Sequence, residues 1–150
     1  MKLRVVATAV SAMAAVALAV APANAQAKPH PYDHKDPAKS GCWNSAKVVR
    51  TADIKSRLEP TVGTIKLWWS FKCKTNWVEI RTAASATGSI SVYAKDGRSD
   101  TYRFSKGNKG RHWGNMIEAN NMCAWGSASI RWNGGKGGQY GQGTTGKACK

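Results

Sequence analysis

The sequence predicts an all-β fold, a small antiparallel sandwich or barrel of about six strands that is cross-linked by disulfides. Several runs alternate between apolar and polar residues, and this two-residue period is typical of half-buried strands. Glycine and proline clusters separate these runs. Four cysteines in a short chain favour a framework of two disulfides.

Residues 1–25 have the features of a secretory signal peptide. Lys2 and Arg4 precede a run rich in Ala and Val, and small residues follow up to a cleavage site after Ala25. The apolar run is short for a membrane anchor, which is the alternative interpretation. We therefore expect a secreted protein, extracellular or associated with the cell wall, with no transmembrane segment after cleavage. Cleavage leaves 125 of the 150 residues, the size of one domain.

Residues 26–41 contain three prolines and few apolar side chains, which predicts an extended or turn-rich N-terminal arm. Tyr32 is the side chain expected to anchor it. His30, Asp33 and His34 lie within five residues and are possible copper or zinc ligands. We nevertheless expect no metal and no cofactor, because a flexible segment does not supply the required geometry.

The expected β domain spans residues 42–132. Its strands are predicted at residues 47–54, 62–71, 77–82, 89–95, 100–105 and 128–132. The clearest alternation places Ile65, Leu67, Trp69 and Phe71 on the core face of the second strand. Asp96-Gly97 is a strong hairpin signal, residues 106–111 form a basic, glycine-rich loop, and residues 115–122 are one helical turn or a loop. Residues 133–150 contain seven glycines and are expected to form a mobile tail, unless Cys149 holds it.

The four cysteines are Cys42, Cys73, Cys123 and Cys149. In an exported chain an even number indicates disulfides, and four cysteines allow three connectivities. No two of them lie two to four residues apart, so the spacing does not resemble a zinc site.

The charge of the mature chain favours polyanionic partners. The formal charge is +15, or +13 after the two signal-peptide cations are removed. Anionic cell-wall polymers, nucleic acid and acidic membrane surfaces are the candidates. The expected binding residues are cations from several strands and loops, with two tryptophans as a stacking surface: Lys66, Lys72, Lys74, Arg81, Lys106, Lys109, Arg111, Trp68 and Trp77. The alternative is that both tryptophans belong to the core.

An enzyme is a second hypothesis. The motifs of serine hydrolases and zinc peptidases are absent, and acidic residues are few. Glu79, Arg81 and His112 would supply the base, cation and acid of a small secreted ribonuclease if they met in space. A third hypothesis, an antimicrobial or inhibitory protein with a protein target, rests on small size, disulfides and positive charge. We expect a monomeric, non-enzymatic domain that binds an anionic cell-surface or extracellular polymer.

Three segments carry a resemblance to a known family. Residues 33–42 (DHKDPAKSGC) resemble the "DGKDPxxTGC" opening of the secreted bacterial DUF2690 domains. Residues 65–77 (IKLWWSFKCKTNW) are similar to the "hydrophobic-RYS-xxC-xxNWAR" core of that family, and residues 113–117 (WGNMI) resemble its "YTxMV" segment. The resemblance covers about residues 32–124, in order.

The resemblance implies a small extracytoplasmic disulfide-bearing domain, common in actinobacteria, with no established catalysis. It favours Cys42 and Cys73 as structural residues, and our first choice of pairing is Cys42–Cys73 with Cys123–Cys149. The chain departs from the pattern at Tyr32, where the family often has a cysteine. It also has Trp68 in place of the arginine of "RYS" and Val78-Glu79 in place of the final Ala-Arg.

Overall fold

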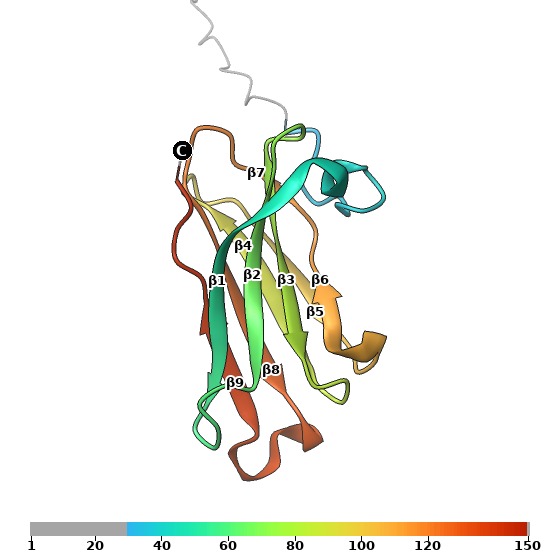
Figure 1. Ribbon diagram of the computed structural model, residues 1–150, viewed down its shortest axis with the longest axis vertical. Coiled ribbons are helices and arrows are strands. Elements are labelled where there is room, and N and C mark those ends of the chain that lie inside the picture. The colour runs from blue at the N-terminus through green and yellow to red at the C-terminus, as the bar shows by residue number, and fades with distance from the viewer. Residues whose placement is uncertain (1–29, 150) are drawn as a thin grey trace, which may run out of the picture.

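The computed structural model describes residues 30–149 (Figure 1). The expected signal peptide at residues 1–25 and the start of the arm at residues 26–29 lie outside the described residues. The described part contains nine strands: β1 (Ala46–Ser56), β2 (Gly63–Ser70), β3 (Thr75–Thr82), β4 (Thr87–Ala94), β5 (Ser99–Phe104), β6 (Arg111–Trp113), β7 (Ile117–Glu118), β8 (Ala124–Arg131) and β9 (Tyr140–Thr144). It also contains three short 3₁₀ segments, η1 (Cys42–Ser45), η2 (Asn108–Gly110) and η3 (Asn133–Gly138).

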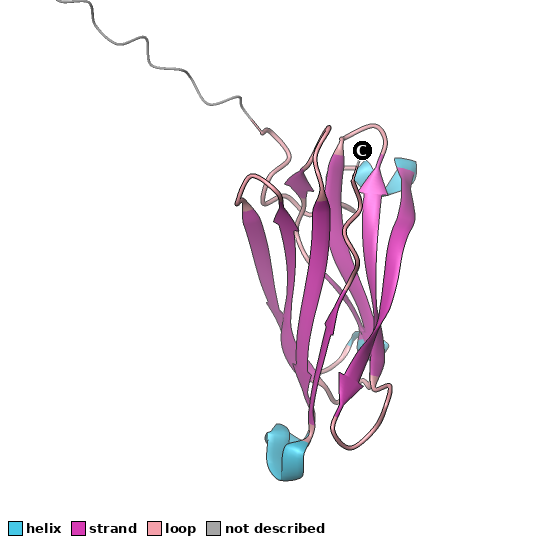
Figure 2. Ribbon diagram, turned by 90° about the vertical axis from the view of Figure 1, so that its left-hand side faces the viewer, coloured by secondary structure: helices cyan, strands magenta, loops and turns pink. Residues whose placement is uncertain are grey.

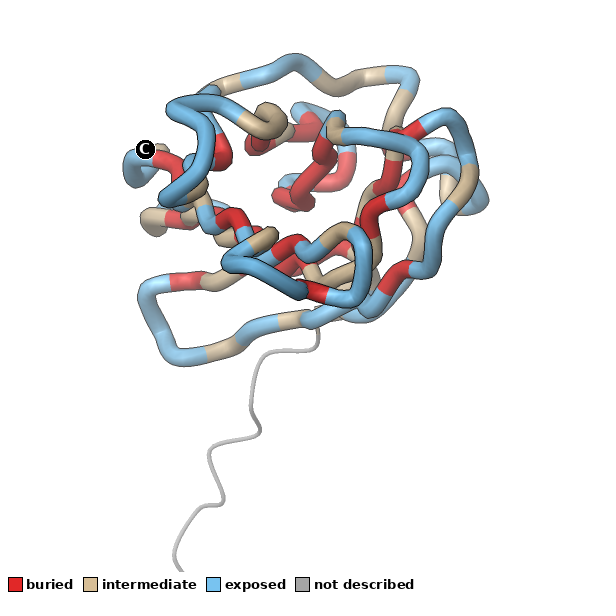
Figure 3. The backbone as a smooth tube through the Cα atoms, turned by 90° about the horizontal axis from the view of Figure 1, so that it is seen from below, coloured by how far each residue is buried: buried red, intermediate tan, exposed pale blue. Residues whose placement is uncertain are grey.

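The strands form one antiparallel sheet that curls into a nearly closed barrel. Its order is β5-β4-β8-β9-β1-β2-β3-β6, and β7 pairs with β3. Figure 2 shows the two halves of this sheet facing each other, and in Figure 3 the backbone encircles the interior. The predicted all-β, disulfide-bearing class is therefore confirmed, with nine strands rather than about six.

Strands β6, β7 and β9 account for the difference, and β9 lies in the glycine-rich segment that we expected to be a mobile tail. It pairs with β8 and β1 and so joins the two halves of the sheet. Gly141 and Gly143 point inward, where an added Cβ would lie 2.6 Å from a Val62 methyl carbon and 2.7 Å from the Asp53 carbonyl oxygen. Only a residue without a side chain allows this close approach. Because β9 is part of the sheet, the β domain does not end at residue 132, and residue 133 is not a structural boundary.

The interior is filled by the inward side chains of both halves. Ile54, Ile65, Leu67, Val78, Ile80, Ile90, Val92, Phe104, Ile117 and Ile130 are all buried. The predicted core face of β2 is confirmed for Ile65, Leu67 and Trp69. It is wrong for Phe71, which is 41% exposed. Strand β2 ends at Ser70, and the Phe71 N–H donates to the Ser45 carbonyl oxygen at 3.0 Å, so the alternation stops one residue earlier than expected.

A second, smaller core lies on the outer face of β2 and β3, beneath the N-terminal segment. Cys42, Trp77 and Met116 are fully buried there, and Tyr32 packs against them. Backbone hydrogen bonds join His34 to the Met116 carbonyl and Met116 to the Lys35 carbonyl, both at 2.9 Å. The described residues of the arm are therefore folded onto the sheet, and Tyr32 contacts the body as predicted.

Both disulfides have the pairing that was our first choice, Cys42–Cys73 and Cys123–Cys149. Such bonds persist in oxidising compartments. Among residues 30–149 no helix is long and apolar enough to span a membrane.

Candidate functional site

Four tryptophans meet on the outer face of β2, β3 and β6. Trp68 and Trp77 are cross-strand partners whose rings are parallel within 1°, with centroids 6.0 Å apart. Trp43, from η1, lies over them and over Trp113, with centroid distances of 5.3 to 5.5 Å. Trp77 is fully buried beneath this cover, so it has no free ring face and does not belong to the predicted stacking surface. Trp43, Trp68 and Trp113 remain partly exposed.

Arg111 is fixed among these rings by a buried carboxylate. Its Nε and Nη2 donate to the two Glu79 oxygens at 3.1 and 3.2 Å, the bidentate geometry of strong charge-assisted hydrogen bonds. Its guanidinium carbon lies 5.3 Å from the Trp43 ring centroid and 5.6 Å from that of Trp113, within cation–π range. Glu79 is only 2% exposed, and Arg111 therefore compensates a charge that would otherwise be buried alone.

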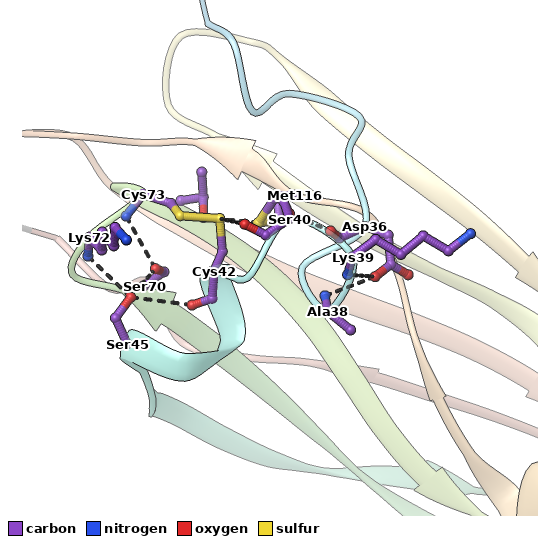
Figure 4. Close-up of a disulfide and its surroundings, with 11 residues drawn as sticks. Asp36, Ala38, Lys39, Ser40, Cys42, Ser45, Ser70, Lys72, Cys73 and Met116 are labelled. Carbon is purple, nitrogen blue, oxygen red and sulfur yellow. Dashed lines mark hydrogen bonds between the residues drawn. A yellow bond between two sulfur atoms is a disulfide. The ribbon is translucent and has the colours of Figure 1, made fainter.

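Asp36, in the segment that resembles the family's opening motif, holds the arm against this cluster. Its Oδ1 accepts hydrogen bonds from the backbone N–H groups of Ala38 and Lys39 at 2.8 and 2.9 Å (Figure 4). Its Oδ2 accepts one from Trp113 Nε1 at 3.2 Å. A single carboxylate thus fixes both the turn before η1 and the ring at the edge of the cluster.

Asp33 makes a second attachment, to the β5 side of the molecule. Its Oδ1 accepts from the Glu118 backbone N–H at 2.6 Å, and its Oδ2 pairs with Arg98. Arg98 also binds Asp96 at 2.7 Å. Burial disfavours the charge of Arg98, but the hydrogen bonds with Asp96 and Asp33 outweigh burial and raise its pKa.

The carboxylates are largely occupied inside the protein, and this leaves an excess of free positive charge. Six of the eight bind a cation, a histidine or backbone donors: Asp33, Asp36, Glu79, Asp96, Asp100 and Glu118. Only three arginines take part in the ion pairs of the described residues, Arg81, Arg98 and Arg111. Most lysines therefore face solvent without a carboxylate partner in residues 30–149.

Five of the seven predicted cations lie toward one end of the outer surface formed by β2, β3 and β6. Lys66 is paired across β2 and β3 with Glu79, and Arg81 is paired across β3 and β6 with Arg111. Lys106 and Lys109 lie on the loop that leads into β6.

That loop packs against the end of β3. The Gly107 N–H donates to the Ala84 carbonyl oxygen at 2.8 Å. Gly110, at φ +74°, approaches the Thr82 carbonyl so closely that a Cβ would lie 1.8 Å from its oxygen. Lys72 and Lys74, by contrast, lie on the β2–β3 turn, at the other end of these strands.

We define the Trp–Arg face as Trp43, Trp68, Trp113, Lys66, Arg81 and Arg111. Trp43 and Trp113 were not among the predicted binding residues. Trp43 follows Cys42 in a segment without strand periodicity, and its position depends on how the arm folds back. Trp113 lies in a three-residue strand, which is too short to show which way its side chains face.

The three candidate nuclease residues do not form one site. Glu79 is paired with Trp113 and faces outward, whereas His112 is paired with Ile80 and faces the interior. The His112 ring stacks on Phe104 with centroids 4.3 Å apart. The sheet lies between the imidazole and the carboxylate, so the condition of the nuclease hypothesis, that these residues meet in space, is not met in this fold.

The burial of His112 predicts a pH dependence of stability. Burial lowers the pKa of His112, so the folded state favours the neutral ring. The contribution of His112 to the free energy of unfolding is fully present above the ordinary histidine pKa of about 6.5. It declines as the pH falls below that value, because the unfolded chain takes up the proton first. Urea unfolding from pH 8 to pH 5 should show this decline, and His112→Phe should weaken it. An unchanged slope in that variant would contradict the prediction.

The histidines of the arm interact with different acidic residues. His34 Nδ1 lies 2.7 Å from Asp100 Oδ2, and His30 Nδ1 lies 3.8 Å from Glu118 Oε1. Within residues 30–149 no three histidine, cysteine or acidic side chains are grouped closely enough to hold a metal ion.

Comparison with known proteins identifies the family. The family model described as "Protein of unknown function (DUF2690)" matches residues 30–130. The comparisons with curated proteins and with solved structures gave no match. The match extends from the arm to the end of β8, and includes the Cys42–Cys73 disulfide, both aspartates that hold the arm, and the tryptophan cluster. The chain therefore belongs to the DUF2690 family.

Proposed function

We propose that this protein is a secreted, monomeric, non-enzymatic domain that binds an anionic cell-surface or extracellular polymer through the Trp–Arg face. The observation that carries the proposal is the separation of charge on this face. The Glu79 carboxylate is buried and bound by Arg111, whereas Arg81 is 59% exposed beside it. Lys66, from the face itself, and Lys106 and Lys109, from the loop that leads into β6, add further positive charge.

The chemistry of the face suits a chain of repeated negative charges. Exposed cations attract phosphate or carboxylate groups over a distance set by the salt concentration. The partly exposed indole rings of Trp43, Trp68 and Trp113 add apolar area on which bases or sugar rings stack. The separation of Glu79 from His112 supports binding without cleavage.

Secretion is part of the same proposal. The signal-peptide pattern of residues 1–25 and the two disulfides support an extracellular or wall-associated location.

Binding of purified residues 26–150 tests the proposal. The samples are intact cell wall, wall stripped of its anionic polymer, and RNA, across a salt series, with RNA integrity measured in the same tubes. We expect retention that weakens as salt rises, without RNA cleavage. Absence of binding to every polymer at about 50 mM salt, where such attraction is strong, would overturn the proposal. RNA cleavage would replace it with the nuclease hypothesis.

The double variant Arg81→Gln/Lys109→Gln should bind the polymer about thirtyfold more weakly at about 50 mM salt, because each surface cation near a polyanion contributes about 1 kcal/mol. The slope of log affinity against log salt should also become shallower by about two. The matched control Lys72→Gln/Lys74→Gln removes the same charge at the other end of the strands, and should have a much smaller effect. Equal losses in both variants would show that net charge, and not this face, determines binding.

A further inference from the structure

The opposite side of the barrel presents a second face with different chemistry. The alternation of β4 places Thr87, Ser89, Ser91 and Tyr93 on the side opposite the buried Ile90 and Val92. Ser91 is only 8% exposed there, and its hydroxyl is hydrogen-bonded to that of Thr101 at 2.8 Å. The pairing of β4 with β5 and β8, and of β8 with β9, extends this outer face over four strands. Its side chains are Thr87, Ser89, Ser91, Tyr93, Ser99, Thr101, Arg103, Ser105, Trp125, Ser127, Ser129, Arg131, Tyr140, Gln142 and Thr144. We call these residues the hydroxyl face.

The composition of the hydroxyl face is unlike that of the Trp–Arg face. Nine of its residues are Ser or Thr, two are Arg, and none is Asp or Glu. Asp100, from β5, points inward and binds His34. The register aligns the side chains in rows across the strands. One row is Arg103, Ser89, Ser129 and Gln142.

The hydroxyl face is also hollowed. An open groove of about 450 Å³ is lined by Ser89, Arg103, Ser129, Arg131 and Tyr140, among others. An adjoining hollow of about 300 Å³ shares Ser89 and Ser129 with this groove. The second hollow continues the first along the strands, with Ser91, Tyr93, Ser127, Gln142 and Thr144 in its lining.

Aromatic rings lie at both ends of the continuous hollow that these two cavities form along the strands. At one end Tyr93 and Trp125 stack with centroids 5.6 Å apart, and Lys147 Nζ lies 5.2 Å from the Trp125 ring centroid. At the other end Tyr140 is 53% exposed beside Arg131. The six residue steps along β4 from Thr87 to Tyr93 separate these ends by about 20 Å, since a strand rises about 3.3 Å per residue.

We propose that the hydroxyl face binds a linear acidic polysaccharide whose chain runs along the strands. Ser and Thr hydroxyls both donate and accept, as sugar hydroxyls do. Arg103 and Arg131 match sugar carboxylates bidentately, and the absence of an acidic residue on the face removes repulsion of that charge. Tyr140, which is 53% exposed, offers a flat ring to the apolar face of a sugar unit. This site is separate from the Trp–Arg face and does not rest on the function proposed for it.

Titration with polygalacturonate tests the inference, with dextran as the neutral comparison and polyphosphate as the sugar-free polyanion, at about 150 mM salt. Polygalacturonate should bind more tightly than either. Arg103→Gln/Arg131→Gln should weaken its binding about tenfold, as expected when two charge-assisted contacts are lost. Tyr140→Ala should also weaken it, with unchanged thermal unfolding because the ring is half exposed.

The control is Lys72→Gln/Lys74→Gln, which removes the same charge from the β2–β3 turn, outside both faces, and should leave polygalacturonate binding within about twofold. If Arg81→Gln/Lys109→Gln loses polygalacturonate binding while Arg103→Gln/Arg131→Gln retains it, the inference is overturned and the Trp–Arg face is the site for this polymer. Polyphosphate binding as tight as that of polygalacturonate would also overturn it, because the sugar would then contribute nothing.

Discussion

Removing the Cys42–Cys73 disulfide by the double variant Cys42→Ala/Cys73→Ala is expected to lower the free energy of unfolding by about 3 to 4 kcal/mol. The two cysteines are 31 residues apart in the sequence, and without the bond the unfolded chain regains the entropy of an open loop. A domain of this size has a total stability of only about 5–15 kcal/mol, so the loss is a large fraction of it. Urea unfolding of the variant and the wild type measures the difference.

The structural consequence should be local to the N-terminal segment. Cys42 begins η1, and Trp43 beside it covers Trp68, Trp77 and Trp113. Figure 4 shows how the bond attaches this segment to the β2–β3 turn, with Ser45 and Ser70 hydrogen-bonded at 2.7 Å next to it. When the bond is absent, the segment detaches more easily, and we expect the tryptophan fluorescence to shift to the red before the main unfolding transition.

The second disulfide provides the matched control. Cys123 and Cys149 are 26 residues apart, so Cys123→Ala/Cys149→Ala should lose a similar amount of loop-closure stabilisation. That bond holds the segment after β9 to the start of β8 and does not touch the arm. Its removal should therefore produce no early fluorescence change. An early red shift in both double variants would contradict the role assigned to Cys42–Cys73.

The sequence predicts the central strands well because apolar and polar side chains alternate along them in step with the buried and exposed faces of the sheet. In β2, Ile65, Leu67 and Trp69 alternate with Thr64, Lys66 and Trp68, and the burial follows that pattern. The same holds for Ile90 and Val92 in β4. A half-buried strand needs this period, and six or more residues are enough to show it.

The remaining parts were missed because their positions depend on residues far away in the chain. Strand β9 has glycines inward, so it shows no apolar face, and only the closeness of Val62 and Asp53 explains why. Trp77 lies on the outward side of β3, where alternation predicts exposure. It is buried because a segment more than thirty residues earlier folds back over it.

In the candidate site, too, some residues could be predicted from the local sequence, whereas others depend on distant parts of the chain. Lys66, Arg81 and Arg111 could be selected from charge alone, and the structure places them together. The pairing of Arg111 with Glu79 and the cover supplied by Trp43 could not be selected, because both depend on the register of β3 with β6 and on the path of the arm. The register also places His112 and Glu79 on opposite faces of the sheet, because adjacent positions along a strand face opposite sides.

Glu79→Ala is expected to destabilise the protein by about 3 kcal/mol, because it leaves the Arg111 guanidinium without its partner among Trp43 and Trp113. The estimate lies at the lower end for a buried pair because the Arg111 side chain is 38% exposed and keeps some hydration. Thermal or urea unfolding measures the loss. Arg81→Ala is the control: Arg81 is 59% exposed and lies 3.8 Å from Glu79, so its removal should change stability by less than about 1 kcal/mol.

A compensating variant separates a structural role of Glu79 from a chemical one. Glu79→Leu/Arg111→Met replaces both charges with apolar groups of similar size, and should recover most of the stability that Glu79→Ala loses, since the desolvation of both ions disappears. Failure to recover would mean that the pair supplies more than mutual neutralisation. If wild-type protein cleaved RNA and Glu79→Gln abolished that activity at unchanged stability, Glu79 would instead be catalytic. The burial of its carboxylate under Arg111, with His112 on the other side of the sheet, favours the structural role.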